Sequence, residues 1–303
     1  MTERLMIVSL GDVLVDIVSL IDGPISYGTD TFVRISITPG GSAANFATWA
    51  SRLGAKAALI GKVGDDVFGR YLREDLLAEG VAASLATGPG ATGINQALVD
   101  HLGERTMLAD RGASATLDIA DLDWGMLDKA NLLHLTAYSF VTEPCHRAAH
   151  AAMKRVAGHG ATLSMDASSY KVLRDLGARS FRELTQGVHI LFANLEEGRE
   201  LTGESEPEGI LRTLAETYEV VALKLGAQGG MATTRGEKAT CPAPKVEALD
   251  TTGAGDAFAA AFVVKWLTTG NLSASLAAAV ALASKVVQKP GARPQVSLQS
   301  KGW

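Results

Sequence analysis

The stretch Asp250-Thr-Thr-Gly-Ala-Gly-Asp256-Ala-Phe258 lies where a loop runs into an Ala-rich, apolar helix. Its two glycines, Gly253 and Gly255, permit backbone conformations that other residues avoid, so successive N–H groups can point at one anion beside a helix N-terminus. The Asp256 carboxylate and a phosphate group would repel each other, so a carboxylate at this position suggests that it has a role in catalysis. Taking the proton from a hydroxyl group that is being phosphorylated would be such a role. The pattern therefore predicts either a phosphate cradle with a base, or a simple turn with a helix cap.

The composition of the chain around this stretch is that of an ordinary globular protein, with 303 residues, 47% of them hydrophobic and 20% charged. A net charge of −5 argues against nonspecific binding of nucleic acid, which requires a basic surface. Cys145 and Cys241 lie far apart in the sequence and indicate neither a zinc site nor a disulfide framework. Because no uninterrupted apolar stretch is long enough to span a membrane, we expect a soluble, cytoplasmic protein without a targeting signal and without membrane or nucleic-acid partners.

Short β-rich runs alternate with helical patterns along the chain, which is typical of a parallel sheet with crossover helices. The runs are 5–10, 57–63, 131–135, 161–165, 188–193 and 220–225, and two Ala-rich helices are expected at 257–267 and 273–287. Residues 31–38 instead alternate between apolar and polar side chains, and residues 94–110 resemble a hairpin that turns at 101–104. These half-exposed strands are expected to form a small sheet that covers a site as a lid.

A second Gly-rich element, Pro39-Gly40-Gly41-Ser42-Ala43-Ala44-Asn45, also leads into a helix. The glycine pair allows a ligand to approach the backbone closely, and the Asn45 amide offers both a donor and an acceptor to a polyol. A simple turn followed by a buried Asn is the alternative interpretation.

Residues 40–64 and 250–262 resemble the two signature regions of the ribokinase-like (PfkB) carbohydrate kinases, in matching order and separation. Between them, Asn194-Leu-Glu-Glu197 resembles the NxxE element of this family, and Lys224-Leu-Gly226-Ala-Gln-Gly229 resembles its strand-to-turn segment that contacts nucleotide. The resemblance covers nearly the whole chain. It implies an α/β fold, a three-layer α/β/α sandwich with a mainly parallel central sheet. It also implies one domain over residues 1–303, with a lid formed by about 13–38 and 92–110. No GxxxxGK[ST] sequence is present, so a P-loop does not compete as an explanation.

The resemblance assigns roles to the matching residues on the donor side. Asp256 is expected to act as the catalytic base, while the amides of Gly253, Ala254 and Gly255 form the anion hole. Nucleotide contacts are expected from Asn194, Lys224, Gly226 and Gly229, with ATP as the donor. Glu197, together with Asn194, is expected to hold Mg²⁺ through water, since magnesium usually keeps several waters and shares phosphate oxygens. The alternative for Asn194 and Glu197 is a capped, solvent-facing helix start.

On the acceptor side, Asp16 matches the sugar-hydroxyl ligand of the family and is joined by Gly40, Gly41 and Asn45. The chain departs from the strict ribokinase pattern at Leu14, where that pattern has Asn. One polar sugar contact is therefore missing, which suits an acceptor with an apolar part or one that is held by lid residues, for which Phe32, Ile94 and Gln96 are candidates. Tyr138 follows a strand and either faces the acceptor pocket or is an ordinary strand-end tyrosine.

Some members of this family bind a monovalent cation beside the anion hole through backbone carbonyls. The positions that match here are Asp250, Thr252, Val286, Lys289 and Gly291, so K⁺ is an expected cofactor besides ATP and Mg²⁺. A homodimer through the lid strands is also expected, because exposed sheet edges favour strand pairing.

These observations together predict an ATP-dependent kinase that phosphorylates a hydroxyl of a small sugar or sugar derivative. A nucleoside kinase of the same family is the first alternative, because Leu14 and an apolar lid would tolerate a base. A noncatalytic nucleotide or sugar sensor is the second, and a damaged base or cradle would be its mark.

Overall fold

A computed structural model describes residues 5–100 and 105–298. Within these residues, nine strands form one sheet in the order β13-β12-β11-β10-β9-β8-β1-β4-β5. All neighbours pair in parallel except β11 with β12 and β12 with β13, which are antiparallel. The strands are β1 (Met6–Leu10), β4 (Lys56–Gly64), β5 (Ala82–Gly88), β8 (Leu132–Thr136), β9 (Thr162–Asp166), β10 (Ile190–Asn194), β11 (Val220–Lys224), β12 (Gly230–Thr234) and β13 (Lys238–Cys241). The six predicted strands of the parallel sheet are confirmed.

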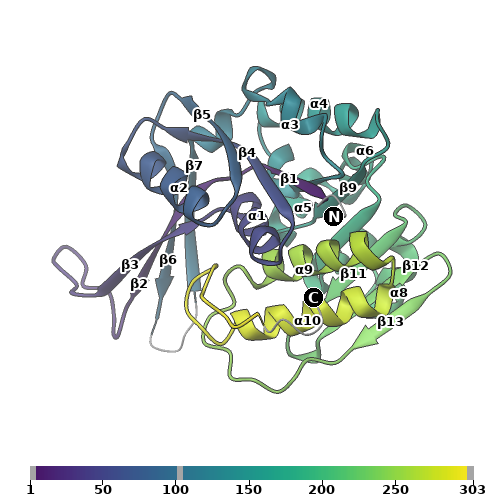
Figure 1. The fold of residues 1–303 in the computed structure, drawn as a ribbon. Helices are drawn as coiled ribbons and strands as arrows, with labels where there is room; N and C mark the ends of the chain where they lie inside the picture. Colours follow the sequence, from purple (N-terminus) through teal and green to yellow (C-terminus); the bar gives the residue numbers. More distant parts are fainter. Residues whose placement is uncertain (1–4, 101–104, 299–303) are drawn as a thin grey trace.

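Helices cover both faces of this sheet, as Figure 1 shows. One apolar core lies between the sheet and α1 (Ser42–Arg52), α2 (Val67–Ala78), α9 (Ala254–Thr269) and α10 (Leu272–Val286). A second core lies on the other face, against α4 (Cys145–Ala157), α5 (Tyr170–Leu176), α6 (Ala178–Leu184), α7 (Leu195–Thr202) and α8 (Pro207–Leu214). Short helical turns are α3 (Trp124–Leu127), η1 (Ala113–Thr116), η2 (Ile119–Asp121), η3 (Ala137–Phe140) and η4 (Gly226–Gln228). The predicted three-layer α/β/α sandwich is thereby confirmed.

Burial on both faces explains why the central strands are continuously apolar. All five residues of β1 and all five of β8 are buried, because a parallel sheet with helices on each side exposes neither face to water. The buried residues of α9 run without interruption from Ala257 to Val263. α9 contacts α1 and α10, and its Phe258 and Phe262 pack against Phe192 of β10 in the sheet.

A second sheet extends from the body in the order β3-β2-β6-β7, with β2 (Leu14–Leu20), β3 (Arg34–Gly40), β6 (Thr92–Val99) and β7 (Arg105–Gly112). β3 begins at Arg34, later than the alternation from residue 31 predicts. β6 and β7 pair antiparallel, as expected of a hairpin, and its predicted turn at 101–104 lies outside the described residues.

The two faces of this smaller sheet differ in character. Because neighbouring positions along a strand face opposite sides, Thr38, Asp16 and Asn95 lie on one face in register. Ile37, Ile17 and Leu108 are in register on the other face. One face is therefore polar near the body. The opposite face carries several apolar side chains, with Gln96 between Ile17 and Leu108.

No helix within residues 5–100 and 105–298 is long and apolar enough to cross a membrane.

Candidate active site

Asp256 lies in the first turn of α9 and is held from α1 by two hydrogen bonds. Ser42 Oγ donates to Asp256 Oδ1 at 2.5 Å, and Asn45 Nδ2 donates to Asp256 Oδ2 at 2.8 Å. Burial raises the pKa of Asp256 to about 6, while the hydrogen bonds from Ser42 and Asn45 oppose that rise. The two Gly-rich motifs, which are 211 residues apart at this contact, thus meet on one carboxylate.

Asn45 is itself fixed by a residue that the sequence did not single out. Arg293 Nε donates to Asn45 Oδ1 at 2.7 Å, and Arg293 Nη2 donates to the carbonyl oxygen of Gly40 at 3.0 Å. Arg293 Nη1 pairs with Asp75 Oδ2 at 2.6 Å. No motif surrounds Arg293 in the sequence, so only the fold shows that this charge is buried beside Asn45.

Asp16, on β2, lies buried against the first glycine of the early motif. A Cβ atom at Gly40 would collide with the Asp16 carboxylate, so this position requires glycine for close approach. Burial raises the pKa of Asp16 to about 6, opposed by the hydrogen bond from Asn95 and by the charge of Arg293. The structure therefore brings Asp16, Gly40, Gly41 and Asn45 together, as predicted for an acceptor site.

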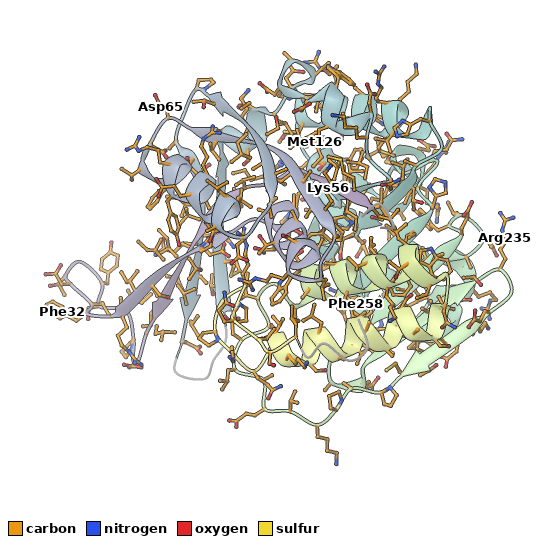
Figure 2. All side chains as sticks on the ribbon, viewed as in Figure 1. Phe32, Lys56, Asp65, Met126, Arg235 and Phe258 are labelled. Carbon is orange, nitrogen blue, oxygen red and sulfur yellow. The ribbon has the colours of Figure 1, made fainter. Side chains whose placement is uncertain are left out.

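The prediction that Phe32, Ile94 and Gln96 face the acceptor is wrong. Phe32 is 96% exposed and lies at the outer end of the loop between β2 and β3, far from the body (Figure 2). Ile94 and Gln96 flank Asn95 on β6, so they face the opposite side of the sheet from Asp16. Asn95 is the residue that reaches this carboxylate, through Nδ2 to Asp16 Oδ1 at 3.3 Å. The alternation of side chains along a strand identifies Asn95 as a neighbour of Asp16 only when the pairing of β2 with β6 is known.

A pocket of about 370 Å³ joins Asp256 to the predicted nucleotide residues. Its predicted lining residues are Gly253, Gly255, Asp256, Asn194, Glu197, Lys224 and Gly226, and it is completed by Ser42, Tyr138, Asp166 and Ser168. Tyr138 therefore faces the pocket, and burial raises the pKa of its hydroxyl to about 12. Such a hydroxyl stays protonated near neutral pH and can donate a hydrogen bond.

Lys224, at the end of β11, is oriented by a carboxylate that sequence reasoning missed. Its Nζ lies 2.7 Å from Asp166 Oδ2, and both side chains are largely buried. Burial lowers the pKa of Lys224, but the Asp166 and Glu197 carboxylates raise it by more. Nζ lies 3.3 Å from the position that a Cβ atom on Gly255 would occupy, which places a full positive charge beside the predicted anion hole.

Asn194 and Glu197 form a reciprocal cap at the start of α7. Glu197 N donates to Asn194 Oδ1 at 2.8 Å, and Asn194 N donates to Glu197 Oε2 at 2.7 Å. Asn194 Nδ2 also donates to Glu197 Oε1 at 2.8 Å. Asn194 and Glu197 thus cap the helix, as the alternative interpretation expects. The helix start does not face solvent, however, since Glu197 is 2% exposed. Burial raises the pKa of Glu197.

A second, mostly apolar pocket of about 390 Å³ adjoins the first. Lys224, Gly226 and Gly255 line both pockets. The side chains that surround the rest of the second pocket come mainly from the segment 243–248 and from α9 and α10, and include Pro244, Val246, Phe258, Val280 and Val287. Gly229 also lines it. The polar pocket beside Asp256 thus continues into a mostly apolar pocket of similar volume.

Residues 4–298 match the pfkB family carbohydrate kinases. The chain belongs to this family. The ATP-dependent ribose-1-phosphate kinase of Halopiger xanaduensis is 35% identical over 84% of this chain and 82% of its own length. Fructokinase-1 of Oryza sativa subsp. japonica is 32% identical over 85% of this chain and 82% of its own. In structure, the adenosine kinase from Sinorhizobium meliloti superposes with a TM-score of 0.88 at 25% identity, covering 98% of each chain.

Membership confirms three predictions from the sequence, namely the family, the ribokinase-like fold and the enzyme class. The protein is an ATP-binding carbohydrate kinase, which the matches to sugar kinases favour over a nucleoside kinase or a noncatalytic sensor.

In this kinase the loop before α9 is tied to the segment after α10. Asp250 Oδ1 accepts hydrogen bonds from Thr252 N at 2.9 Å and Thr252 Oγ1 at 2.6 Å, and Asp250 Oδ2 accepts one from Gly291 N at 2.8 Å. Lys289 N donates to the Val286 carbonyl at 3.1 Å. All five residues that were predicted for a monovalent cation therefore border this junction. Among residues 5–100 and 105–298, no cluster of three His, Cys, Asp or Glu side chains is arranged for a metal ion.

Proposed function

We propose that Asp256 is the general base of this kinase and takes the proton from the acceptor hydroxyl as the γ-phosphoryl group of ATP is transferred to it. The observation that supports this is the position of the Asp256 carboxylate, which lines the polar pocket. It accepts hydrogen bonds from Ser42 and Asn45 of the Gly-rich element 39–45, which we call the acceptor motif. A base with a pKa near 6 is ionised at neutral pH and still basic enough to accept a proton. The acceptor is a small sugar or sugar derivative.

The charge on the transferring group is stabilised by the start of α9 and by Lys224. The first N–H groups of a helix have no carbonyl partner inside it. The Ala254 amide donates to the Thr251 carbonyl at 3.3 Å, and the amides of Gly253 and Gly255 flank it at the start of α9. Each preorganised donor in a comparable site contributes roughly 10²- to 10³-fold in rate.

The acceptor is held by Asp16 and Asn45 over the backbone of Gly40 and Gly41. A carboxylate can accept hydrogen bonds from two neighbouring hydroxyls, which suits a polyol. Leu14 lies on the same face of β2 as Asp16 and is buried, so the acceptor meets an apolar side chain there. Asn95 supplies an amide beside Asp16 that partly replaces the missing polar contact.

Mg²⁺ would be held through water by Glu197 and Asn194 and directly by phosphate oxygens. Both Glu197 oxygens already accept hydrogen bonds from Asn194, but a carboxylate has about four lone-pair sites, so a metal-bound water can still donate to it. When bound, Mg²⁺ neutralises charge on the phosphates. Backbone carbonyls around Asp250, Thr252, Val286, Lys289 and Gly291 would hold K⁺ beside the anion hole.

We also propose that the chain folds as one domain and that the four-stranded sheet, from about 13–38 and 92–110, acts as its lid and as the surface of a homodimer. Ile35, Ile37 and Leu108 are 60%, 49% and 53% exposed on the face away from Asp16, so these three apolar side chains are available for contact with a second copy. A cytoplasmic location fits the two free cysteines and the use of ATP.

The test is an acceptor panel with ATP consumption as the readout, run with the wild-type protein and with Asp256→Asn. The panel contains fructose, ribose, ribose 1-phosphate and adenosine. The variant should bind ATP with nearly unchanged affinity in calorimetry, while transfer to the best acceptor falls by about 10²- to 10⁴-fold, as for loss of a general base. Unchanged turnover in the variant would refute the role of Asp256, and adenosine as the best acceptor would favour a nucleoside kinase.

A further inference from the structure

Arg293 is a buried arginine whose hydrogen bonds end on the acceptor motif. Its side chain is 3% exposed, and it donates to Asn45 Oδ1, to the Gly40 carbonyl and to Asp75 Oδ2. The pairing with Asp75 on α2 balances its charge. The other two bonds go to residues that border the acceptor site, and charge balance alone does not require them.

The bond to Asn45 decides which way the Asn45 amide points. An arginine only donates hydrogen bonds, and an ionised carboxylate only accepts them. Placed between Arg293 and Asp256, the amide must therefore turn Oδ1 toward Arg293 and Nδ2 toward Asp256, as the distances of 2.7 and 2.8 Å show. Without Arg293, a flipped amide would place its oxygen against the carboxylate oxygen of Asp256.

The same segment also borders the anion hole. The Ala292 carbonyl accepts a hydrogen bond from Trp49 Nε1 on α1 at 3.1 Å and lies 2.5 Å from the place of a Cβ atom at Gly253. Gly291 N donates to Asp250. Residues 291–293 therefore connect the phosphate side of the site to helix α1 on the acceptor side.

We propose that Arg293 is a positioning residue for phosphoryl transfer, which fixes the Asn45 amide so that it holds the Asp256 carboxylate toward the acceptor hydroxyl and which, through Gly40, shapes the acceptor floor. This proposal rests on the proposed role of Asp256 as base. Arg293 does not touch the reacting atoms and acts through Asn45.

The test must separate positioning from stability, because Arg293→Met alone leaves the largely buried Asp75 carboxylate without its cation. The double variant Arg293→Met with Asp75→Leu removes both charges together, which commonly restores the stability that the single change loses. We expect the double variant to melt near the wild-type temperature. Its kcat/KM for the acceptor should nevertheless stay about 10²-fold down, since small misplacements of reacting groups cost that much. KM for ATP should be nearly unchanged.

Arg52 with Glu79 provides a matched control. Arg52 Nη1 donates to the Arg293 carbonyl at 3.1 Å and to the Pro294 carbonyl at 2.9 Å, and Arg52 Nη2 pairs with Glu79 at 2.6 Å. It thus anchors the same segment through its backbone without contacting Asn45. The double variant Arg52→Met with Glu79→Leu should keep kcat/KM near the wild-type value.

A readout independent of turnover distinguishes failure of this proposal from failure of the proposed function. The side-chain amide signals of Asn45 in a ¹⁵N-labelled protein should shift and exchange faster with solvent in the Arg293→Met, Asp75→Leu variant. Wild-type protein that phosphorylates no sugar would refute the function, whereas unshifted Asn45 signals, or full acceptor kcat/KM in that variant, would overturn the role of Arg293.

Discussion

At the scale of single residues, the site depends on carboxylates whose burial opposes their ionisation. Asp16 and Asp256 both have pKa values raised to about 6, with burial as the largest cause in each. Raised values of this kind concentrate at functional sites, because a base must be free of its proton and still able to accept one. The hydrogen bonds from Ser42 and Asn45 lower the pKa of Asp256 and so oppose the effect of burial.

The first prediction concerns the pH dependence of catalysis. Because Asp256 must be ionised to accept a proton, kcat/KM for the acceptor should be level above about pH 7 and fall as the pH drops below about 6, near the pKa of Asp256. Initial rates between pH 5 and 8, at fixed ionic strength, check this. Asp16→Asn is the comparison: it should weaken acceptor binding but keep the acid limb, and loss of that limb would assign it to Asp16 instead.

The second prediction concerns stability at the same carboxylate. A folded pKa of about 6 against a reference of 3.8 means that the folded state binds the proton more tightly than the unfolded state. The contribution of Asp256 to stability is therefore present below about pH 4 and is lost as the pH rises through about 6. The Asp256→Asn variant does not ionise, so it does not lose stability as the pH rises. The new Asn side chain can donate a hydrogen bond from its nitrogen to Ser42 and accept one at its oxygen from Asn45.

Thermal melting of both proteins between pH 4 and 8 tests that sign. The Asp256→Asn variant should melt above the wild type at pH 8, and the difference should shrink toward zero near pH 4. A difference that is constant across this range would show that the carboxylate is not strained by burial.

Residues differ in how far the sequence reveals them. Asp256, Asn45 and Asp16 stand in motifs that resemble those of a family, so their roles could be predicted. Asp166 and Arg293 stand in no such motif, and their partners lie 58 and 248 residues away in the chain. Contacts of that separation are set by topology, which no local pattern encodes.

At the scale of elements, the start of α9 positions the amides of the proposed anion hole. The Ala-rich pattern predicts a helix from residue 257, but the structure begins α9 at Ala254, after Gly253 in the left-handed conformation with φ 71°. This earlier start brings Asp256 into the first turn, where its side chain reaches α1. Helix boundaries are the least certain part of a sequence prediction, because caps depend on a few residues.

The third prediction compares the two left-handed glycines that flank α9. Gly270 has φ 61° and no other side chain or backbone close to where a Cβ atom would project, so it should tolerate Ala at a cost of about 1 kcal/mol for the left-handed conformation alone. Gly253→Ala adds a collision with Ala292 and should cost more in denaturant unfolding, as well as lowering kcat. Equal stability and kcat in the two variants would show that the close approach at Gly253 has no structural role.

At the scale of the whole molecule, the site forms where parallel strands end. Asp166, Asn194 and Lys224 close β9, β10 and β11, and Tyr138 follows β8. In open α/β sheets, ligands bind outside the carboxyl ends of the strands. The polar sheet face that carries Asp16 lies against Gly40, which Arg293 and Asn45 connect to Asp256. The proposed donor and acceptor residues therefore meet between the body and the proposed lid.

The fourth prediction concerns assembly through that lid. Light scattering should give about twice the chain mass of 31.6 kDa, and the double variant Ile35→Lys with Leu108→Lys should give the monomer, since two charges on an apolar interface oppose its burial. Leu77→Lys on α2, at a side chain that is 77% exposed outside the lid, is the control and should remain dimeric. A monomeric wild type at working concentration would refute the dimer.

The linear order of residues was enough to establish the alternation of buried strands and helices, the Gly-rich loops and the carboxylate that follows one of them. These features depend on local periodicity and on backbone conformations that few residues adopt. Three pairings came instead from the folded arrangement: Asn95 rather than Gln96 meets Asp16, Asp166 holds Lys224, and Arg293 orients Asn45. The partner of a buried polar or charged side chain is the group that lies within hydrogen-bonding distance in the folded chain. Strand register and helix packing determine which group that is.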